Sequence, residues 1–407
     1  MDVSRFRNSP SGRPVQANAG GVAYWAFVPA PLPPAFPPDA ELMRVSSQAA
    51  YALGELAALG RGLANPHLLI GPFLRREAVL SSRIEGTQAG IAELYAYEAG
   101  QLSAPRAAPA SVSDVQEVFN YVRALEYGME RLATLPVGLP LIREVHERLM
   151  QGVRGGMAAP GEFRHVQNWI GRHGCTLVDA DYVPPPVPEM LEALDAFEGY
   201  LHSFTDEYPP LVRLSFIHYQ FEAIHPFLDG NGRVGRLLTS LLLMSWQLLP
   251  LPLLYLSAYF ERYRPRYYDL LSAVSERGAW REWTLFFLQG VVEQARDASD
   301  RSRRLHDLES EWRERLTGAR APALALKLAE SLFVSPILTI PQAQKLLDVT
   351  YPTALRCVEK LVEARILQPT SGATYGRAFA AERILAIVND PVRSDDATYR
   401  FPAPSIN

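Results

Sequence analysis

The segment HPFLDGNGRVGR, residues 225–236, constrains the fold more than any other part of this chain. Pro226 cannot continue a helical hydrogen-bond ladder, so the apolar helix predicted before it ends at His225. Gly230 and Gly232 allow a tight turn and a close approach of backbone to a ligand. Another apolar run follows directly. The sequence therefore predicts two helices joined by a short loop that presents His225 at its mouth.

The residue types in this loop are those that bind anions. A glycine-rich turn at the start of a helix offers unpaired N–H groups and the positive end of the helix dipole. Arg233 and Arg236 are three residues apart, so they share one helix face and reach the same anion. Asp229 suits Mg²⁺ bound mainly by phosphates and water, and His225 suits proton transfer near neutral pH. Together they predict a polyphosphate site with a metal ligand and a base.

Length and composition limit the class of protein. A chain of 407 residues predicts two or three domains, and 48% hydrophobic residues suffice for a buried core. A net charge of -4 argues against a general nucleic-acid or membrane binder. Cys175 and Cys357 form no disulfide framework, which fits a reducing, cytoplasmic location. The apolar stretch 237–256 contains polar residues and two prolines, so it predicts a buried helix rather than a membrane span.

Helical periodicity dominates the chain and predicts a mainly α fold. Residues 1–40 are rich in proline and glycine and are predicted to form an extended arm against the body. Residues 161–186 are predicted to form a small β-hairpin followed by a polyproline turn. Helices are predicted over residues 41–63, 73–86, 111–135, 141–153, 187–204 and 211–225.

The pattern changes near residue 319. A helix, a turn, a second helix and two short strands joined by a glycine-containing turn predict a winged helix-turn-helix. The long helix before it loses its apolar stripe midway, so we expect it to leave the core and become a connector. The chain then divides into an N-terminal arm and helical region (1–110), a central core (111–300), and a connector with the winged helix (301–407).

Residues 225–236 resemble the signature of the Fic family, HPFxDGNGRxxR, at every fixed position. The resemblance implies a mostly helical core and transfer of AMP from ATP to a Ser, Thr or Tyr hydroxyl of a target protein. It implies that His225 deprotonates this hydroxyl and that Asp229 binds Mg²⁺. Relatives that transfer other groups alter this loop, which is intact here. The implied ATP-binding residues of the loop are Gly230, Asn231, Gly232, Arg233, Val234, Gly235 and Arg236, with Arg236 at the γ-phosphate.

The segment SSRIEG, residues 81–86, resembles the inhibitory motif [S/T]xxxE[G/N] of the same family. Ser81 and Glu85 are four residues apart, on one helix face, and Gly86 follows. A guanidinium accepts one good bidentate partner. If Glu85 pairs with Arg236, the γ-phosphate loses its partner. The resemblance therefore implies autoinhibition in cis by an N-terminal helix.

Two further stretches extend the resemblance. The segment GEFR, residues 161–164, resembles the start of the family's flap, which holds a target backbone by strand addition. Arg164 is expected to support this flap, whose pairing strand corresponds to Asn168, Trp169, Ile170 and Gly171. A tyrosine pair resembles the family's adenine pocket, with Tyr267 preferred over Tyr268.

Alternatives remain open from the sequence. Residues 351–364, the expected recognition helix, carry Arg356 and Lys360 but also Glu359 and Glu363. Because phosphate contacts need clustered positive charge, protein interaction or homodimerisation is slightly favoured over DNA binding. A nucleotide-sensing DNA-binding regulator, or an enzyme that removes AMP with Glu85 positioning water, are the rival functions. The base contacts do not decide which nucleotide is preferred.

Overall fold

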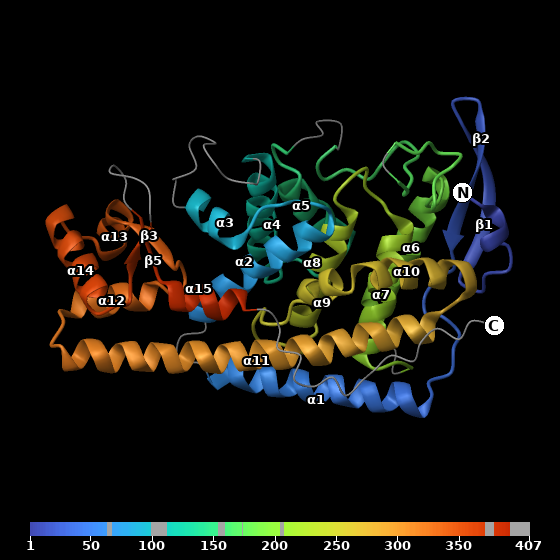
Figure 1. Ribbon diagram of the computed structural model, residues 1–407. Helices are drawn as coiled ribbons and strands as arrows, with labels where there is room; N and C mark the ends of the chain where they lie inside the picture. The colour runs from blue at the N-terminus through green and yellow to red at the C-terminus, as the bar shows by residue number, and fades with distance from the viewer. Residues whose placement is uncertain are drawn as a thin grey trace.

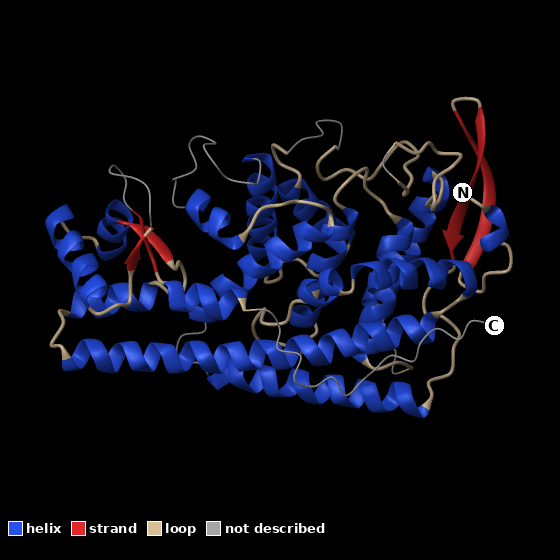
Figure 2. Cartoon of the chain, in the orientation of Figure 1, coloured by secondary structure: helices blue, strands red, loops and turns tan. Residues whose placement is uncertain are grey.

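The computed structural model describes residues 1–62, 67–98, 112–153, 159–172, 174–203, 207–370 and 378–390. These residues are mainly helical, as predicted, with one two-stranded and one three-stranded sheet (Figure 1). The two sheets lie at opposite ends of an elongated molecule (Figure 2).

The predicted helices are present, each within a few residues of its expected bounds except α2, which begins six residues earlier. The eight residues of α3 are too few to show a helical period, and this helix was not predicted. The helices before the long α11 are α1 (Ala40–Gly62), α2 (His67–Ile84), α3 (Ile91–Glu98), α4 (Val112–Arg131), α5 (Leu139–Leu149), α6 (Val187–His202), α7 (Pro210–Ile224), α8 (Asn231–Ser245), α9 (Ser257–Arg262) and α10 (Arg264–Arg277).

Helices α7 and α8 form the centre of this part. Helix α7 is buried along nearly its whole length because α6, α8, α10 and α11 all contact it. Helix α8 is buried from its first residue to Leu243, except at the half-buried Gly232. The loop between the two helices is therefore held at both ends by elements that cannot move independently of the core.

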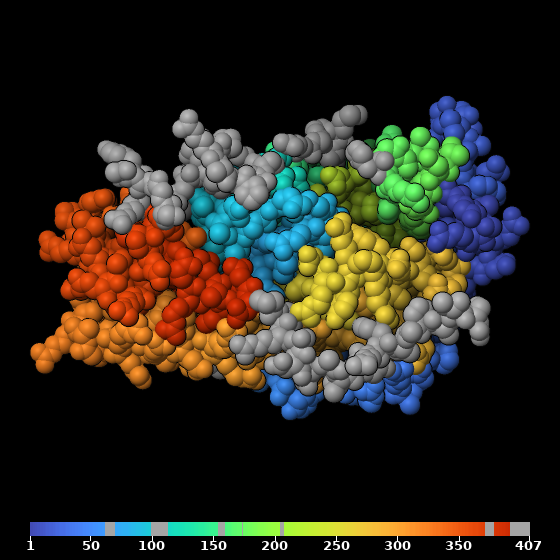
Figure 3. All heavy atoms as spheres, viewed as in Figure 1, coloured from blue at the N-terminus to red at the C-terminus, as the bar shows by residue number. Residues whose placement is uncertain are grey.

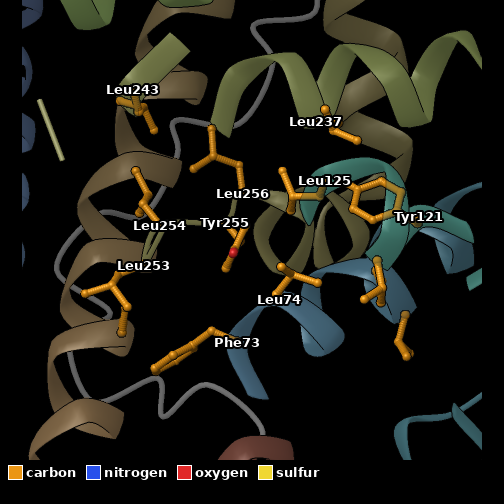
Figure 4. Close-up of a cluster of buried hydrophobic side chains, with 14 of the residues drawn as sticks. Phe73, Leu74, Tyr121, Leu125, Leu237, Leu243, Leu253, Leu254, Tyr255 and Leu256 are labelled. Carbon is orange, nitrogen blue, oxygen red and sulfur yellow. The ribbon is translucent and has the colours of Figure 1, made fainter. Parts of the chain in front are cut away.

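Helix α2 is packed into the same core. Phe73 and Leu74 of α2 and Tyr121 of α4 belong to one cluster of buried apolar side chains (Figure 4). Midway along α2, buried Glu77 accepts hydrogen bonds from the Tyr121 hydroxyl (3.1 Å) and the Ser257 N–H (3.3 Å). Burial raises the pKa of Glu77, against the effect of these donors. The middle of α2 is thus fixed by both apolar and polar contacts.

The prediction of an extended N-terminal arm is wrong for residues 12–29. A short 3-10 helix, η1 (Val3–Arg5), precedes strands β1 (Gly12–Ala19) and β2 (Val22–Pro29), which pair as an antiparallel hairpin. The turn is formed by Gly20 and Gly21, both at positive φ (60° and 86°). A Gly-Gly pair between two strands is a hairpin signal that the proline-rich composition obscured.

The hairpin predicted at residues 161–186 is reduced to a loop. One antiparallel pair closes it, with Ile170 and Tyr182 exchanging backbone hydrogen bonds of 2.8 and 3.0 Å. The following prolines have no N–H to extend a ladder. The loop instead packs against the N-terminal hairpin, and the Phe27 N–H donates a hydrogen bond to the Val183 carbonyl (2.8 Å). The surface of the segment that contains this loop (green) borders that of the N-terminal segment (dark blue) in Figure 3.

Helix α11 (Trp280–Gly318) does not leave the core as predicted. Its second half buries Leu305, Leu308, Trp312 and Leu316, because helices α12 and α15 of the C-terminal part cover it. Helix α1 packs along its first half. The predicted boundary at residue 300 therefore falls within one continuous helix.

The C-terminal elements follow the predicted order of helix, turn, helix and two strands. The sheet is antiparallel in the order β3-β5-β4. The turn predicted between its last two strands, residues 371–377, lies outside the described residues, and assignment to the winged-helix class stays a prediction. The elements are α12 (Ala323–Ser331), β3 (Ile337–Thr339), α13 (Ile340–Leu347), α14 (Tyr351–Glu363), β4 (Gln368–Pro369), β5 (Ala378–Ala380) and α15 (Glu382–Asn389).

Across the part of the chain that the structure describes, no helix is both long and apolar enough to cross a membrane.

The packing of α2 predicts a large effect of Leu74→Ala on stability. Leu74 is 1% exposed, so the shorter side chain leaves a cavity and lowers the free energy of unfolding by about 2–5 kcal/mol. Urea unfolding followed by circular dichroism measures this. Tyr51→Ala is the matched control, since Tyr51 is 70% exposed on α1. Equal unfolding midpoints for the two variants would contradict the placement of α2 in the core.

Candidate active site

His225 ends α7 and faces the loop. Its backbone is left-handed (φ 49°, ψ 61°) because Pro226 follows and cannot continue the helix. The ring Nδ1 lies 3.2 Å from the Glu222 carbonyl oxygen. A carbonyl only accepts, so Nδ1 carries the proton and Nε2 keeps its lone pair. The fold thus holds His225 in the tautomer that can take a proton at Nε2.

The surroundings of His225 keep its ring neutral. Its side chain is half-buried, and burial lowers the pKa of His225 to about 4. The Glu222 carbonyl and the charges of Glu85 and Asp229 act against this shift, whereas Arg164 adds to it. A neutral imidazole with a free Nε2 is the form that a general base requires near pH 7.

Side chains of the loop fix its shape. The Asn231 amide nitrogen donates to the Phe227 carbonyl and its oxygen accepts from the Phe227 N–H, both at 2.8 Å. Gly230 turns the chain into α8 with φ 81°. Both polar atoms of the Asn231 side chain are therefore used within the loop, and its contact with a phosphate stays a prediction.

His146 of α5 supports the loop and was not predicted. Its ring stacks on Phe227, with centroids 3.7 Å apart and planes 9° apart. The Gly161 N–H donates to Nδ1 (2.9 Å), so Nε2 carries the proton and donates to the Asp229 carbonyl (3.1 Å). Burial lowers the pKa of His146 to about 4. No local sequence signal reveals this role, because the contact joins positions 83 residues apart.

Two residues of the predicted flap also hold the loop. Arg164 is 1% exposed and donates from Nε to the His225 carbonyl (3.0 Å) and from Nη2 to the Pro185 carbonyl (2.5 Å). It is a support, as predicted. The Asn168 amide donates to the Phe227 carbonyl (2.8 Å). Asn168 thus braces the loop, and its direct docking of a target stays a prediction.

The remaining predicted flap residues face outwards. Trp169 and Ile170 are 42% and 40% exposed. Because Ile170 uses its backbone groups to pair with Tyr182, those of Trp169 and Gly171 point to the opposite side. The docking of a target strand at this edge stays a prediction.

The N-terminus of α8 forms an anion cradle. The N–H groups of Asn231, Gly232 and Arg233 have no acceptor within the helix. The N-cap residue is Gly230, which has no side chain to cap them. The Arg233 guanidinium is 4% exposed and is held by Glu117 (3.1 Å) and by Asp229 (3.5 Å). The cradle thus combines backbone donors, a helix dipole and a fixed positive charge.

Two residues of the predicted nucleotide site do not face this cradle. Val234 is 1% exposed and packs in the core. Gly235 lies against α7, where an added Cβ would come within 2.5 Å of Glu222 Oε1. Their positions correct the prediction that they contact ATP, because the helical period turns both residues away from the anion face.

Asp229 is placed to share a metal ion. Its side chain is 59% exposed, and Oδ1 accepts from the Gly230 N–H (2.6 Å). Among the described residues, no group of three or more His, Cys, Asp or Glu side chains could hold a metal ion. One exposed carboxylate beside an anion cradle fits Mg²⁺, which keeps several waters and shares phosphate oxygens.

Hydrogen bonds to one face of α2 and to the residue that follows it hold the Arg236 guanidinium. Its Nε donates to Ser81 Oγ (2.8 Å), and its Nη2 donates to the Ser81 carbonyl (2.9 Å) and to Glu85 Oε1 (2.6 Å). Ser81 and Glu85 are one helical turn apart, as the sequence predicts. Helix α2 ends at Ile84, and Glu85 and Gly86 follow it in a turn in which Gly86 has φ 105°, a backbone conformation that residues with side chains rarely adopt.

Glu85 itself occupies the anion cradle. A Cβ added to Gly232 would collide with Glu85 Oε1, so this carboxylate lies directly over the glycine. Burial favours the neutral acid, but the charges and hydrogen bond of Arg236, with Arg233, outweigh it and lower the pKa of Glu85. An internal anion therefore sits where an external phosphate would bind.

The two tyrosines differ from their predicted ranking. Tyr267 is 1% exposed and stacks on Phe260 with ring centroids 4.6 Å apart. Its hydroxyl forms a hydrogen bond with His218 Nε2 (2.8 Å). It has no face left for a nucleobase. Tyr268 is 40% exposed, and burial with the charge of Glu85 raises its pKa to about 12. The prediction that Tyr267 is preferred is wrong, because the helical period sends it into the core.

Fold and site together define a class: a helical protein in which a histidine base stands beside a glycine-lined anion cradle. Residues 43–130 match the family described as Fic/DOC family N-terminal, and residues 136–243 match the Fic/DOC family. Two regions of the chain thus match models of the Fic/DOC family. The N-terminal hairpin and the C-terminal elements lie outside both matched regions.

Curated relatives and a solved structure agree with these two matches. The chain is 29% identical over 168 residues to Protein adenylyltransferase Fic of Drosophila willistoni, covering 41% of this chain and 30% of the relative. It is 28% identical over 229 residues to that of Drosophila persimilis, covering 54% and 41%. It thus spans less than half of these relatives. A Fic family protein from Desulfovibrio desulfuricans shares the fold, with a TM-score of 0.55, 20% identity, and coverage of 86% of this chain and 98% of that one.

The environment of His225 predicts an acidic titration. Its ring proton resonance should shift with a midpoint near pH 4, followed by NMR and assigned by its loss in His225→Ala. Since unfolded histidine titrates near pH 6.5, the unfolded chain takes up the proton first as pH falls. The stability contribution is complete above about pH 6.5 and is lost as pH falls towards 4. A midpoint of 6 or higher would show that the ring is not desolvated.

Proposed function

We propose that this protein transfers AMP from ATP to a hydroxyl group of a target protein, with release of pyrophosphate. The observation that carries the proposal is the pairing of a neutral His225, free at Nε2, with the uncapped glycine-rich start of α8. Relatives named protein adenylyltransferase support the same activity.

Each residue of the loop would have a separate role in the reaction. Nε2 of His225 takes the proton of the incoming hydroxyl, whose oxygen attacks the α-phosphorus of ATP. The bond from this phosphorus to the oxygen bridging to the β-phosphate breaks, and pyrophosphate leaves. The N–H groups of the α8 N-terminus and Arg233 bind the phosphates and offset their charge. Catalysis is then mainly positioning and electrostatic stabilisation.

Asp229 would hold Mg²⁺ together with phosphate oxygens and water. When bound, the ion would offset negative charge on the leaving phosphates. The Gly230 N–H and the Arg233 guanidinium orient this carboxylate. The His146 hydrogen bond to the Asp229 carbonyl fixes its backbone.

Glu85 would inhibit this reaction by competing for Arg236. The γ-phosphate needs the guanidinium that Glu85 and Ser81 now hold, and it would meet the Glu85 carboxylate over Gly232. ATP would bind weakly or with its α-phosphate turned from the incoming hydroxyl. The ionised state of Glu85 makes this repulsion electrostatic as well as steric.

Exposed residues around the cradle would bind the other substrate groups. Tyr268 is the tyrosine with a free face for the nucleobase. The outer edge of Trp169 and Gly171 would pair with the backbone of the target. In α14, the Lys360 ammonium pairs with Glu363 (2.7 Å), which favours protein contact over DNA binding for the C-terminal part.

Removing the competing carboxylate should activate the protein. We expect Glu85→Gly to raise incorporation of label from α-³²P-ATP into protein roughly tenfold or more, the factor for about 1.4 kcal/mol of recovered phosphate binding. Label from γ-³²P-ATP should not be incorporated. Incubation with cell lysate, gel separation and mass spectrometry measure the rate and identify the acceptor.

Two variants test the reasons for this activation. Glu85→Gln keeps the size of the side chain but not its charge, and it should restore part of the activity. His225→Ala in the Glu85→Gly background should abolish labelling, while ATP binding persists. Labelling from γ-³²P-ATP, or labelling that survives loss of His225, would refute AMP transfer by this site.

A further inference from the structure

A cavity of 330 Å³ lies behind α2, on the side opposite Glu85. Ser81 and Glu85 are about 40° apart around the helix axis. The cavity-lining residues of α2, Arg76, Leu80 and Arg83, lie roughly 200–260° from Ser81 by the same period. One face of α2 therefore holds Arg236 while the opposite face forms a cavity wall.

The other walls join two distant parts of the chain. Helix α9 contributes Glu261 and Arg262, and the end of α15 contributes Asn389 and Asp390. Both helices contact α2. A ligand in this cavity would therefore touch the inhibitory helix, the core and the C-terminal part at once.

The positive charge beside the cavity is incompletely balanced. Arg301 takes Asp297 in a bidentate pair (2.8 and 2.9 Å), and Arg76 reaches the same carboxylate only at 3.5 Å. Burial and the charge of Arg301 lower the pKa of Arg76 to about 10. Arg83 has no ion-pair partner among the described residues. Two guanidinium groups can thus accept an anion.

The remaining charges limit where an anion can lie. Asp390 is paired with Arg304 (2.6 Å) and Arg262 with Glu293 (2.6 Å). Glu261 is the lining carboxylate without an ion pair in the described part of the chain, so it would repel an anion. The α2 side of the cavity is therefore the favourable one.

Apolar side chains complete the α2 side of the cavity. Val79 and Leu80 of α2, Ile91 of α3 and Ala258 of α9 are the apolar residues that line it. A small molecule with a phosphate and an apolar group matches this mixture, since guanidinium binds phosphate in a bidentate manner.

We propose that this cavity is an effector site for a small phosphorylated molecule, and that its occupation holds α2 in the position that blocks Arg236. The walls exist while α2, α9 and α15 keep their present arrangement. A ligand that binds them stabilises that arrangement and hence the Glu85–Arg236 pair. The regulatory half rests on the proposed function, whereas the site itself does not.

Calorimetric titration of the full chain tests the site, with phenyl phosphate and inorganic phosphate as probes. We expect phenyl phosphate to bind roughly tenfold more tightly, because its ring contacts the apolar wall. Arg83→Gln should weaken binding about tenfold, and Glu261→Gln should strengthen it. Arg356→Gln on α14 is the matched control and should change nothing.

Competition with ATP distinguishes binding in this cavity from binding in the nucleotide cradle. In Glu85→Gly with Mg²⁺, ATP should not displace phenyl phosphate. Displacement by ATP, or equal affinity of the wild type, Arg83→Gln and Glu261→Gln, would overturn the site. These measurements do not depend on AMP transfer, so they hold even if the proposed activity fails.

Hydrogen exchange and AMP transfer test the regulatory half. Phenyl phosphate should slow amide exchange at the end of α2 and lower the residual labelling of the wild type several-fold. It should leave Glu85→Gly unaffected, because that variant lacks the carboxylate that α2 positions. Binding at the cavity with unchanged exchange in α2 and unchanged labelling of the wild type would overturn this half.

Discussion

The Arg236 guanidinium is the point on which the site depends. It lies buried one turn into α8, so its charge must be met by a partner. Ser81 and Glu85 supply that partner from a helix more than 150 positions away in the sequence. Since one guanidinium cannot serve α2 and a phosphate equally, the competition is built into the packing of α2 on α8. The proposed inhibition would then require no change of fold, only a change of the partner of Arg236.

The histidine and the cradle depend on a second layer of contacts. Asn231, His146 and Arg164 use their hydrogen bonds on the backbone of the loop rather than on a ligand. Each satisfies a carbonyl that would otherwise be left open by the left-handed turn at His225 and the proline after it. The loop is thus rigid before any substrate binds, which is the condition for stabilising charge without reorganisation.

The sequence predicted the parts of this site that are local. These parts are the proline after His225, the glycines at the start of α8, and the spacing of Ser81 and Glu85. Each acts within one or two helical turns, and the residues lie where the sequence pattern indicates. The long-range supports, such as His146, carry no pattern because their partners are distant. The ranking of Tyr267 and Tyr268 failed for another reason: adjacent helical residues point about 100° apart, and the phase of the helix is set by tertiary packing. The N-terminal hairpin was missed because proline-rich composition was weighted above the Gly20–Gly21 turn.

The anchoring of α2 restricts how the proposed inhibition could be relieved. Phe73, Leu74 and Glu77 bury the first part of the helix, so its displacement as a whole would expose apolar surface and an unpaired carboxyl. The last turn of α2 is also buried at Ser82 and Ile84; the exposed residues are Arg83 and, just past the helix, Glu85 and the left-handed Gly86. A rearrangement of Glu85 and Gly86 alone would move the Glu85 carboxylate from Gly232 while Ile84 and Leu74 stay in place. A signal that acts on these two residues would therefore need far less energy than one that removes the helix, whereas a ligand bound at Arg83 would hold the end of α2 in place.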